Sequence, residues 1–406
     1  MRQALWAPVV VFAAGAFQLS ATSAIAQSNA APAQPAAAEK LSEREKRAPI
    51  EVQNKLIKAR QEIIEQKKNY QVGLTSVSAK PLKQLTGEID DPMTREERII
   101  HNRKAEDALD MDEAVKSEYY RGEKAYKRAK PAPKVCDVKM KKFDWRIPKK
   151  MTPVRDQNPC GSCWAFSAWG AYESSYLIVN RRSVDGSEQD LIDCAIANDG
   201  SDAGSCDGGL SWKAFEHMMR VGAVNEKTRS YKAVDQQCKS PSKRPIRAVA
   251  WGFVNPAVDL PTVAELKKAL CDYGALSVSM RVVDPAYQDY KKGVYDEYVE
   301  EPYMGSGHAV VLVGWDDRKD NGKGKKGAWL IKNSWGEGWG EKGYGWMSYG
   351  SNLIGRTARW IKAFEDKSLP AYKALRPDLI AAPASSPVAT GGAAAPADAA
   401  SSGTQR

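Results

Sequence analysis

Hydrophobic positions divide the chain into a helical first half and a strand-rich second half. Residues 40–70 are charged, but apolar side chains recur there on one face of a predicted helix. These side chains are Val52, Leu56, Ile63 and Tyr70. A second helical pattern covers residues 94–129, and Gly, Ser, Thr and Pro interrupt residues 73–87 between the two. Two amphipathic helices of this kind have little core of their own, so we expect them to need a partner surface.

Further helices are predicted downstream. Aromatic and small residues recur at helical spacing after Cys163, which predicts an apolar helix with Cys163 in its first turn. Ser187 is followed three positions later by an acidic residue and therefore indicates a second helix start. A short helix is expected over residues 212–221, and Thr262 with Glu265 forms a capping box for another helix.

The second half, from about residue 251, is rich in strand patterns. These patterns cover residues 275–283, 309–315, 329–332, 344–349 and 356–362. Helices followed by strands predict an α+β protein with a helical lobe and a sheet lobe.

The two ends of the chain differ in composition from the rest. A short positive start precedes a largely apolar run over residues 4–17, and residues 24–26 fit a small-residue cleavage pattern. The apolar run is too short for a membrane span. We therefore expect a signal peptide over residues 1–26, export to the periplasm or out of the cell, and no stable membrane insertion. Residues 366–406 lose all pattern, which predicts a disordered tail.

Charge alone indicates no polyanionic partner. The formal net charge is +10, and residues 40–150 hold 28 Lys and Arg against 19 Asp and Glu. No interleaved aromatic residues or helix-turn-helix pattern accompany this excess. We therefore interpret it as solvated helical faces and expect no nucleic-acid binding.

The most informative stretch is residues 157–167, QNPCGSCWAFS. Cys160 and Cys163 allow three interpretations: two buried structural cysteines, a redox or metal pair, or a nucleophile. Zinc needs further ligands at short spacing, but the only histidines are His101, His217 and His308. A redox pair expects a βαβ pattern, whereas the preceding residues are polar loop. We therefore expect no metal and no cofactor.

A helix start at Cys163 favours a nucleophile. The N-terminus of a helix carries partial positive charge and free N–H groups, which stabilise a thiolate. A cysteine nucleophile also needs a base, a group that orients the base, and donors for the oxyanion.

Several motifs resemble those of the papain/cathepsin-type cysteine peptidase family, in an exported precursor of bacterial style. The sequence CGSCW at residues 160–164 is followed by a histidine, His308, 145 residues after Cys163. The other motifs are DWR at residues 144–146, SEQDLIDC at 187–194, CDGG at 206–209, GHA at 307–309 and NSWGEGWG at 333–340. The resemblance covers about residues 143–362.

The resemblance implies a two-lobed papain-like fold with a helical lobe, an antiparallel sheet or barrel lobe, and an active-site cleft between them. It implies that Cys163 attacks peptide bonds as a thiolate paired with a His308 imidazolium and forms a thioester acyl-enzyme. Asn333 would orient the imidazole, and Trp335 would shield their hydrogen bond from water. Gln157 would hold the oxyanion together with the Cys163 backbone N–H.

The resemblance also implies where protein or peptide substrates bind. Gly208 and Gly209 would let a substrate backbone approach closely. The main specificity pocket would lie beside them and be rather polar; its expected residues are Leu210, Ser211, Ser279 and Ser306. We expect an endopeptidase, because no histidine pair is available to hold a terminal carboxylate.

Papain-like enzymes are made as precursors, which implies a role for the first helices. We expect residues 27–133 to be a helical prosegment with a disordered start that acts as an intramolecular inhibitor of a monomeric enzyme. Processing is expected at the Pro-rich joint of residues 130–134, and the catalytic domain would span residues 134–365. The alternative is a charged linker or an arm that binds a partner.

Export and seven cysteines predict disulfides plus one odd thiol, for which Cys163 is the candidate. The resemblance implies the bridges Cys160–Cys206 and Cys194–Cys238. The usual third pair of the family is missing, so we expect Cys136–Cys271; the alternative is two buried free thiols.

Two other functions remain as alternatives. A catalytically silent papain-fold binding protein would lack one of the four catalytic residues. A thiol oxidoreductase would form a reversible bond between Cys160 and Cys163.

Overall fold

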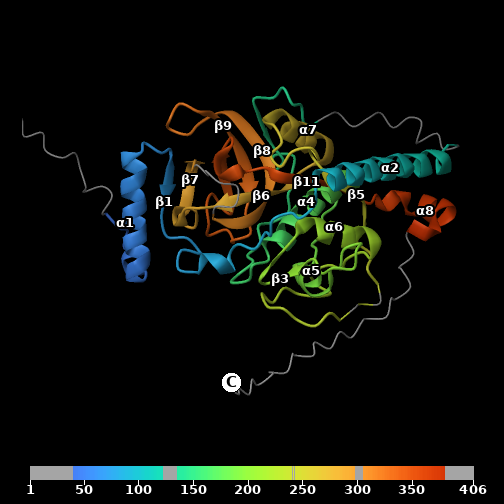
Figure 1. Cartoon of the computed structure of the whole chain (residues 1–406), viewed down its shortest axis with the longest axis horizontal. Coiled ribbons are helices and arrows are strands. Elements are labelled where there is room, and N and C mark those ends of the chain that lie inside the picture. The colour runs from blue at the N-terminus through green and yellow to red at the C-terminus, as the bar shows by residue number, and fades with distance from the viewer. Residues whose placement is uncertain (1–39, 122–134, 240, 242, 298–304, 380–406) are drawn as a thin grey trace, which may run out of the picture.

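The computed structural model describes residues 40–121, 135–239, 241, 243–297 and 305–379 (Figure 1). The expected signal peptide and processing site therefore lie outside the described residues. The first part, residues 40–121, is here called the N-terminal segment. Its elements are η1 (Glu45–Arg47), α1 (Ile50–Glu65), β1 (Tyr70–Val72), η2 (Leu82–Gln84) and α2 (Arg95–Tyr119).

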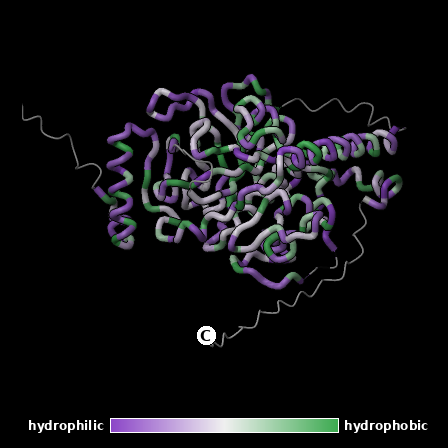
Figure 2. The backbone as a smooth tube through the Cα atoms, viewed as in Figure 1, coloured by the Kyte–Doolittle hydropathy of each residue, from purple (hydrophilic) through white to green (hydrophobic). Residues whose placement is uncertain are grey.

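The N-terminal segment stretches across the whole molecule. Its helices α1 and α2 lie at opposite ends of the view, and the chain between them crosses the body (Figure 1). Both helices are largely hydrophilic along their length (Figure 2). The few apolar side chains of α1 that are buried, Val52 and Leu56 among them, pack into the core of the sheet lobe. At the start of α2, Thr94 and Glu97 form a capping box.

The helical lobe contains α4 (Cys163–Asn180), α5 (Glu188–Cys194) and α6 (Ser211–Arg220). The first fourteen residues of α4 are all buried, as expected for a helix that is apolar on every side. Ser187 caps α5 by accepting a hydrogen bond from the Asp190 N–H. Helix α7 (Val263–Tyr273) begins with the predicted capping box.

The sheet lobe is built around one nine-stranded sheet. Its strands follow the order β1-β7-β10-β9-β8-β6-β11-β5, and β2 pairs with β8. All pairs are antiparallel except β7 with β10. The strands after β1 are β2 (Lys142–Asp144), β5 (Ala248–Phe253), β6 (Leu276–Val282), β7 (Tyr290–Tyr295), β8 (Ser306–Asp320), β9 (Lys326–Lys332), β10 (Tyr344–Ser348) and β11 (Arg356–Ala363). A separate two-stranded sheet pairs β3 (Gly204–Ser205) with β4 (Gly208–Gly209). The predicted α+β architecture is therefore confirmed.

Helix α4 joins the two lobes. Ser167 on its buried face donates to the carbonyl of Val310 in β8 at 2.8 Å and lies 2.8 Å from the Ser277 hydroxyl of β6. Gly170 allows this close approach, because a Cβ there would lie 2.5 Å from a methyl group of Val311. The N-terminus of α4 is thereby held against the strands of the sheet lobe.

One prediction of local structure was wrong, and two strands were not predicted. Tyr70 was expected on a helix, but α1 ends at Glu65 and Tyr70 begins strand β1, where it pairs with Gly293 of β7. Its ring is buried and its hydroxyl donates to Glu297 at 2.7 Å, so an edge position in the sheet satisfies the residue better than a helix face. Strands β5 and β7 were also missed by the hydrophobic pattern.

The disordered tail was predicted to begin at residue 366, but the structure continues in order. Helix α8 (Leu369–Leu375) lies beside α2 because Ala371 and Tyr372 pack on Val115 (Figure 1). The Tyr372 hydroxyl also donates to Asp112 at 2.7 Å. The remainder of the expected tail, from residue 380, lies outside the described residues.

All seven cysteines lie in the described part of the chain. The structure contains the bridges Cys136–Cys271, Cys160–Cys206 and Cys194–Cys238, and Cys163 is free and buried. Within the described ranges, none of the helices has the length and apolar character needed to cross a membrane.

Candidate active site

Cys163 is the first residue of α4 and lies at the junction of the two lobes. The backbone N–H of Ala309 donates to its sulfur at 3.4 Å. Ala309 follows His308 in β8, so the cysteine of the helical lobe lies against the strand that carries the histidine. The structure thus brings together two residues that are 145 positions apart in sequence.

His308 is held by Asn333. The imidazole Nε2 lies 2.9 Å from Asn333 Oδ1, which also accepts the Ser334 N–H at 2.8 Å. Because this oxygen only accepts, the Nε2 atom must carry the proton, and Nδ1 of a neutral ring is then a free base. His308 Nδ1 is buried and has no hydrogen-bond partner among the described residues. It is the nitrogen that remains to take a proton from a thiol.

One tryptophan packs against the histidine, and a second packs against the first. The ring of Trp335 lies 4.8 Å from the imidazole, centroid to centroid, and is fully buried. Trp339 packs edge-on against Trp335. Excluding water strengthens the electrostatic component of the His308–Asn333 hydrogen bond. The shielding role of Trp335 stays a prediction.

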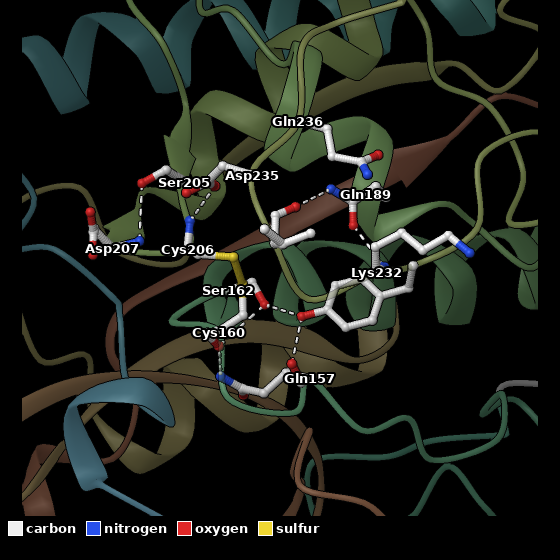
Figure 3. The surroundings of a disulfide bond; sticks show 12 residues. Gln157, Cys160, Ser162, Gln189, Ser205, Cys206, Asp207, Lys232, Asp235 and Gln236 are labelled. Atoms are coloured by element: carbon white, nitrogen blue, oxygen red, sulfur yellow. Dashed lines mark hydrogen bonds between the residues drawn. A yellow bond between two sulfur atoms is a disulfide. The ribbon is translucent and has the colours of Figure 1, made fainter.

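Gln157 lies beside the Cys160–Cys206 disulfide (Figure 3). Its Oε1 accepts the Ser334 hydroxyl at 2.6 Å, and its Nε2 donates to the Cys160 carbonyl at 2.7 Å. The same Nε2 lies 3.2 Å from the carbonyl oxygen of Leu85 in the N-terminal segment. The carboxamide that we expected at the oxyanion is therefore already engaged by a peptide carbonyl.

Residues 73–94 of the N-terminal segment, here called the covering segment, pass directly over Cys163. The backbone N–H groups of Gly87 and Glu88 donate to the Gly307 carbonyl at 3.1 and 3.2 Å. On the other side, Gly209 donates to the Gly87 carbonyl at 2.8 Å and accepts from the Ile89 N–H at 3.1 Å. The covering segment therefore bonds to both lobes and lies between them.

The approach at Gly87 leaves no room for a side chain. A Cβ at this position would lie 1.9 Å from the carbonyl oxygen of Gly161, two residues before Cys163. Only glycine can pass so close to that backbone.

Burial under the covering segment shifts both candidate catalytic groups toward neutrality. Burial raises the pKa of the Cys163 thiol to about 12, and the Glu88 carboxylate adds to this rise against opposing backbone N–H groups. Burial lowers the pKa of His308 to about 4, although the hydrogen bond with Asn333 opposes it. Both shifts disfavour charged forms. The expected thiolate–imidazolium pair is therefore disfavoured in this covered state.

We expect Cys163 of the intact chain to react slowly with iodoacetamide at pH 7. A thiol whose pKa is raised holds little thiolate there, and the thiolate fraction grows about tenfold per pH unit. The alkylation rate, followed by mass spectrometry, is expected to rise up to pH 10 without a plateau. Cys163→Ser serves as the unlabelled control, since the other six cysteines are bridged. A plateau below about pH 8 would contradict this expectation.

Some of the residues expected to set substrate specificity contact the covering segment, and others pack elsewhere. Ser279 Oγ and Ser211 Oγ lie 3.1 and 3.5 Å from Oε1 of Glu88. Gly208 lies close to Gly87, since a Cβ on it would approach the Gly87 carbonyl oxygen to 2.9 Å. The two others have other neighbours: Leu210 is buried in the core of the helical lobe, and Ser306 pairs with Val282 at the start of β8.

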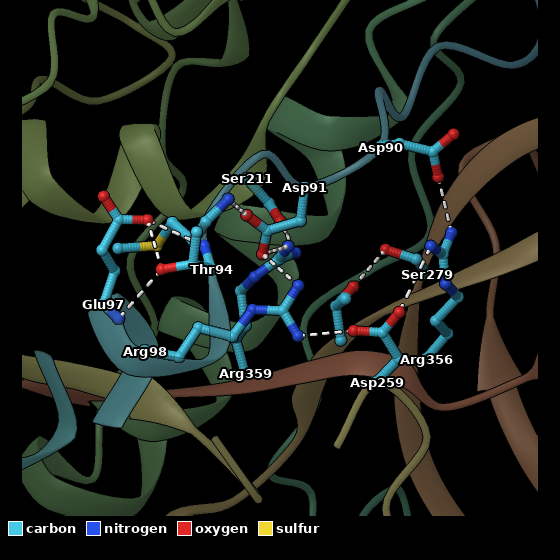
Figure 4. Close-up of polar contacts among 12 residues, drawn as sticks. Asp90, Asp91, Thr94, Glu97, Arg98, Ser211, Asp259, Ser279, Arg356 and Arg359 are labelled. Atoms are coloured by element: carbon cyan, nitrogen blue, oxygen red, sulfur yellow. Dashed lines mark hydrogen bonds and ion pairs between the residues drawn. The ribbon is translucent and has the colours of Figure 1, made fainter. Parts of the chain in front are cut away.

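Sequence reasoning missed Arg359. This residue lies in β11, is fully buried, and donates from Nη1 to Glu88 Oε1 at 3.1 Å and to Ser211 Oγ at 2.9 Å. Its Nη2 donates to Asp91 at 2.9 Å (Figure 4). The sequence does contain a signal for this residue, because Arg359 is a charged side chain within the strand pattern of residues 356–362.

The other two histidines lie outside this site. His101 on α2 stacks on Trp251 at 3.8 Å, and His217 on α6 accepts the Ile196 N–H at 3.2 Å. Burial lowers the pKa of His217 to about 3, and nearby arginines contribute. In the part of the chain that the structure describes, no group of three or more His, Cys, Asp or Glu residues is arranged to hold a metal ion.

The part of the chain that contains this site is similar in sequence to known cysteine proteases. The family model described as "Papain family cysteine protease" matches residues 140–362. "Digestive cysteine proteinase 3" of Homarus americanus is 37% identical over 232 residues, which are 56% of this chain and 66% of that protein. "Procathepsin L" of Mus musculus is 38% identical over 210 residues, 50% of this chain and 59% of that protein. The matched part thus spans somewhat less than two thirds of these relatives.

Solved structures show the same fold. The digestive procathepsin L2 proteinase from the larval midgut of Tenebrio molitor superposes with a TM-score of 0.57 at 24% identity. A recombinant stem bromelain precursor superposes with a TM-score of 0.55 at 23% identity. Each superposition covers 80% of this chain and 95% of the other chain. The superposed part of this chain is therefore longer than residues 140–362, which the family model matches.

These similarities confirm the predicted two-lobed papain-like fold. Because the family model covers more than half of the chain and includes Cys163, His308 and Asn333, the chain belongs to the papain family of cysteine proteases.

Proposed function

We propose that this chain is a cysteine endopeptidase made as a precursor, which the N-terminal segment keeps inactive. The observation that carries the proposal is the free cysteine at the start of α4, beside the strand that carries His308. The Nδ1 of this histidine has no hydrogen-bond partner in the described part of the chain and can act as a base. Three disulfides support an exported protein, since such bridges persist in oxidising compartments. We further propose that the enzyme acts as a monomer without cofactor.

The proposed reaction begins when Cys163 loses its proton to His308 Nδ1 and attacks a peptide carbonyl. The oxyanion is held by Gln157 Nε2 and the Cys163 N–H, each donor contributing about 3 kcal/mol to transition-state stabilisation. His308 then protonates the leaving amine, and a thioester acyl-enzyme remains. Water, deprotonated by His308, releases the acid. Asn333 keeps the imidazole in the tautomer that this sequence of transfers needs.

The covering segment contacts both the Cys163 sulfur and Gln157. Its N–H groups at Gly87 and Glu88 face the sulfur and lower the pKa of the thiol against the effect of burial. The Leu85 carbonyl takes hydrogen bonds from Gln157 and from the Trp335 indole at 3.2 and 3.0 Å. The names procathepsin and precursor, given to similar solved structures, support the same role for this chain. Cutting after α2 would allow the segment to dissociate and give what we call the trimmed enzyme.

An endopeptidase fits better than an exopeptidase. Among the described residues, His101 and His217 are held by partners away from the cleft, so neither is placed to hold a terminal carboxylate. We expect the trimmed enzyme to cut a long peptide that is blocked at both ends, and the intact chain to leave it uncut. Mass spectrometry of the products measures both. Cleavage of peptides only when one end is free would contradict the endopeptidase, and equal rates before and after trimming would contradict the inhibition.

A further inference from the structure

We propose that Arg359 is the specificity-determining residue of the substrate cleft and that it selects an acidic side chain, glutamate or aspartate, in the peptides that are cut. The inference rests on the proposed endopeptidase function and adds its substrate class.

Arg359 projects from β11 into the place where the two lobes meet. On the sheet side, Ser279 of β6 contacts the same Glu88 oxygen as Arg359, and its hydroxyl lies 2.9 Å from that of Thr357. On the helical side its Nη1 donates to the Ser211 hydroxyl at the start of α6, at 2.9 Å. The site is therefore a guanidinium lined by hydroxyl groups, open to the path of the covering segment.

The covering segment places a carboxylate in this site. Glu88 lies next to Gly87, whose backbone passes over Cys163, and its Oε1 contacts Arg359 at 3.1 Å and Ser279 at 3.1 Å. The chain continues on both sides of Glu88, with its backbone bonded to Gly307 and flanked by Gly209. The site therefore receives a side chain from a passing peptide rather than a terminal carboxylate. Burial raises the pKa of Glu88, and the Arg359 guanidinium opposes that rise.

Among the residues that the structure describes, two carboxylates contact Arg359, and both belong to the covering segment. These are Glu88 and Asp91, at 3.1 and 2.9 Å. Arg359 itself is fully buried, and its other described contacts are the Ser211 hydroxyl and the ring of Phe253. In the covered state, Glu88 and Asp91 compensate the free-energy cost of burying the Arg359 charge. When the covering segment leaves, the guanidinium loses both of these carboxylates. A buried charge without a counter-charge is costly, so a substrate that supplies a carboxylate is favoured over one that does not.

Two neighbouring arginines extend the same preference. Asp90, which follows Glu88 by two residues, pairs with Arg356 of the catalytic domain (Figure 4). It also pairs with Arg281. The acidic residues of the covering segment thus face cations of the catalytic domain along the cleft. This charge pattern favours acidic peptides over basic ones.

The competing explanation is that Arg359 only anchors the covering segment and turns away once it is released. The two explanations differ in the trimmed enzyme. An anchor leaves substrate preference unchanged when it is replaced, whereas a specificity-determining residue sets that preference.

The test uses the full chain, folded and then trimmed, and a set of blocked peptides that carry one Glu or its isostere Gln at each position around a cleavage site. At one position we expect kcat/KM to favour Glu over Gln by roughly 10- to 100-fold, the range for a hydrogen bond to a charged group. Arg359→Met, which keeps length and removes charge, is expected to abolish that preference, so that the ratio of kcat/KM for the Glu and Gln peptides falls to about one. Lys362→Met, in the same strand but on its other face, is the matched control and is expected to keep the preference.

A second readout separates this inference from the proposed function. The dissociation constants of the Glu and Gln peptides are measured on trimmed Cys163→Ser protein, with and without Arg359→Met. Glu preference in binding without any cleavage by the wild-type protein would support the acidic site and refute the peptidase. Cleavage without Glu preference at any position, or a preference that survives Arg359→Met, would overturn the role of Arg359.

Discussion

Replacing Cys163 with serine is expected to lower kcat/KM of the trimmed enzyme by at least about 10⁴-fold, because removing a nucleophile typically costs this much or more. Serine has nearly the same size, so the packing at the start of α4 is kept. Its hydroxyl holds its proton far more strongly than a thiol, and His308 alone cannot supply a comparable nucleophile. The measurement is hydrolysis of a doubly blocked fluorogenic peptide, with thermal unfolding to verify that the fold is unchanged.

The base can be tested against a matched histidine. His308→Gln is expected to lower kcat/KM about 10³-fold or more, since glutamine cannot take the thiol proton. His217→Gln replaces another buried histidine, which accepts a backbone N–H on α6 away from Cys163. We expect it to keep kcat within about threefold, since it touches no reacting group. Retained hydrolysis in Cys163→Ser or His308→Gln would refute the proposed mechanism. Absence of hydrolysis by the unmodified trimmed protein would instead favour the silent binding protein.

Gly87→Ala is expected to make the intact chain active before any trimming, with roughly 100-fold more hydrolysis than the unmodified precursor. The added Cβ would lie 1.9 Å from the carbonyl oxygen of Gly161, which is backbone and cannot move aside. Overpacking of this kind costs about 3 kcal/mol, and every 1.4 kcal/mol lost in docking corresponds to about a tenfold larger open fraction. Initial rates are measured while gel electrophoresis shows that the chain is still uncut.

Gly73→Ala is the control on the same segment. Its Cβ would lie 3.2 Å from flexible side-chain atoms of Glu45 and Lys291, far less severe than the overlap at Gly87. We expect this variant to remain as inactive as the unmodified precursor. If Gly87→Ala also stays inactive and its Cys163 remains slow to alkylate, the covering segment does not depend on this close approach.

The local sequence was sufficient to predict a structural element wherever the interactions that form the element lie within one short stretch. The capping boxes at Thr94 and Thr262, the helix start at Cys163 and most strands of the sheet lobe follow from spacing and side-chain chemistry within about ten residues. The resemblance of the cysteine, histidine and asparagine motifs was specific for the same reason, since each motif is contiguous. The roles assigned to these residues stay predictions until variants are measured.

The tertiary structure decided what no local pattern contains. Tyr70 became a strand residue because β7, more than 200 positions later, offers an edge for it. Helix α8 formed because Val115 on α2 provides a surface for an otherwise weak helix.

The site depended on the fold in the same way. Arg359 and Glu88 are 271 positions apart in the sequence and form an ion pair only because the fold places β11 against the covering segment. The sequence by itself determined which side chains could do chemistry, because that depends on functional groups and short spacings. Which peptide lies over them, and which charge faces it, was decided only by the tertiary structure, because burial and pairing arise from contacts between distant segments.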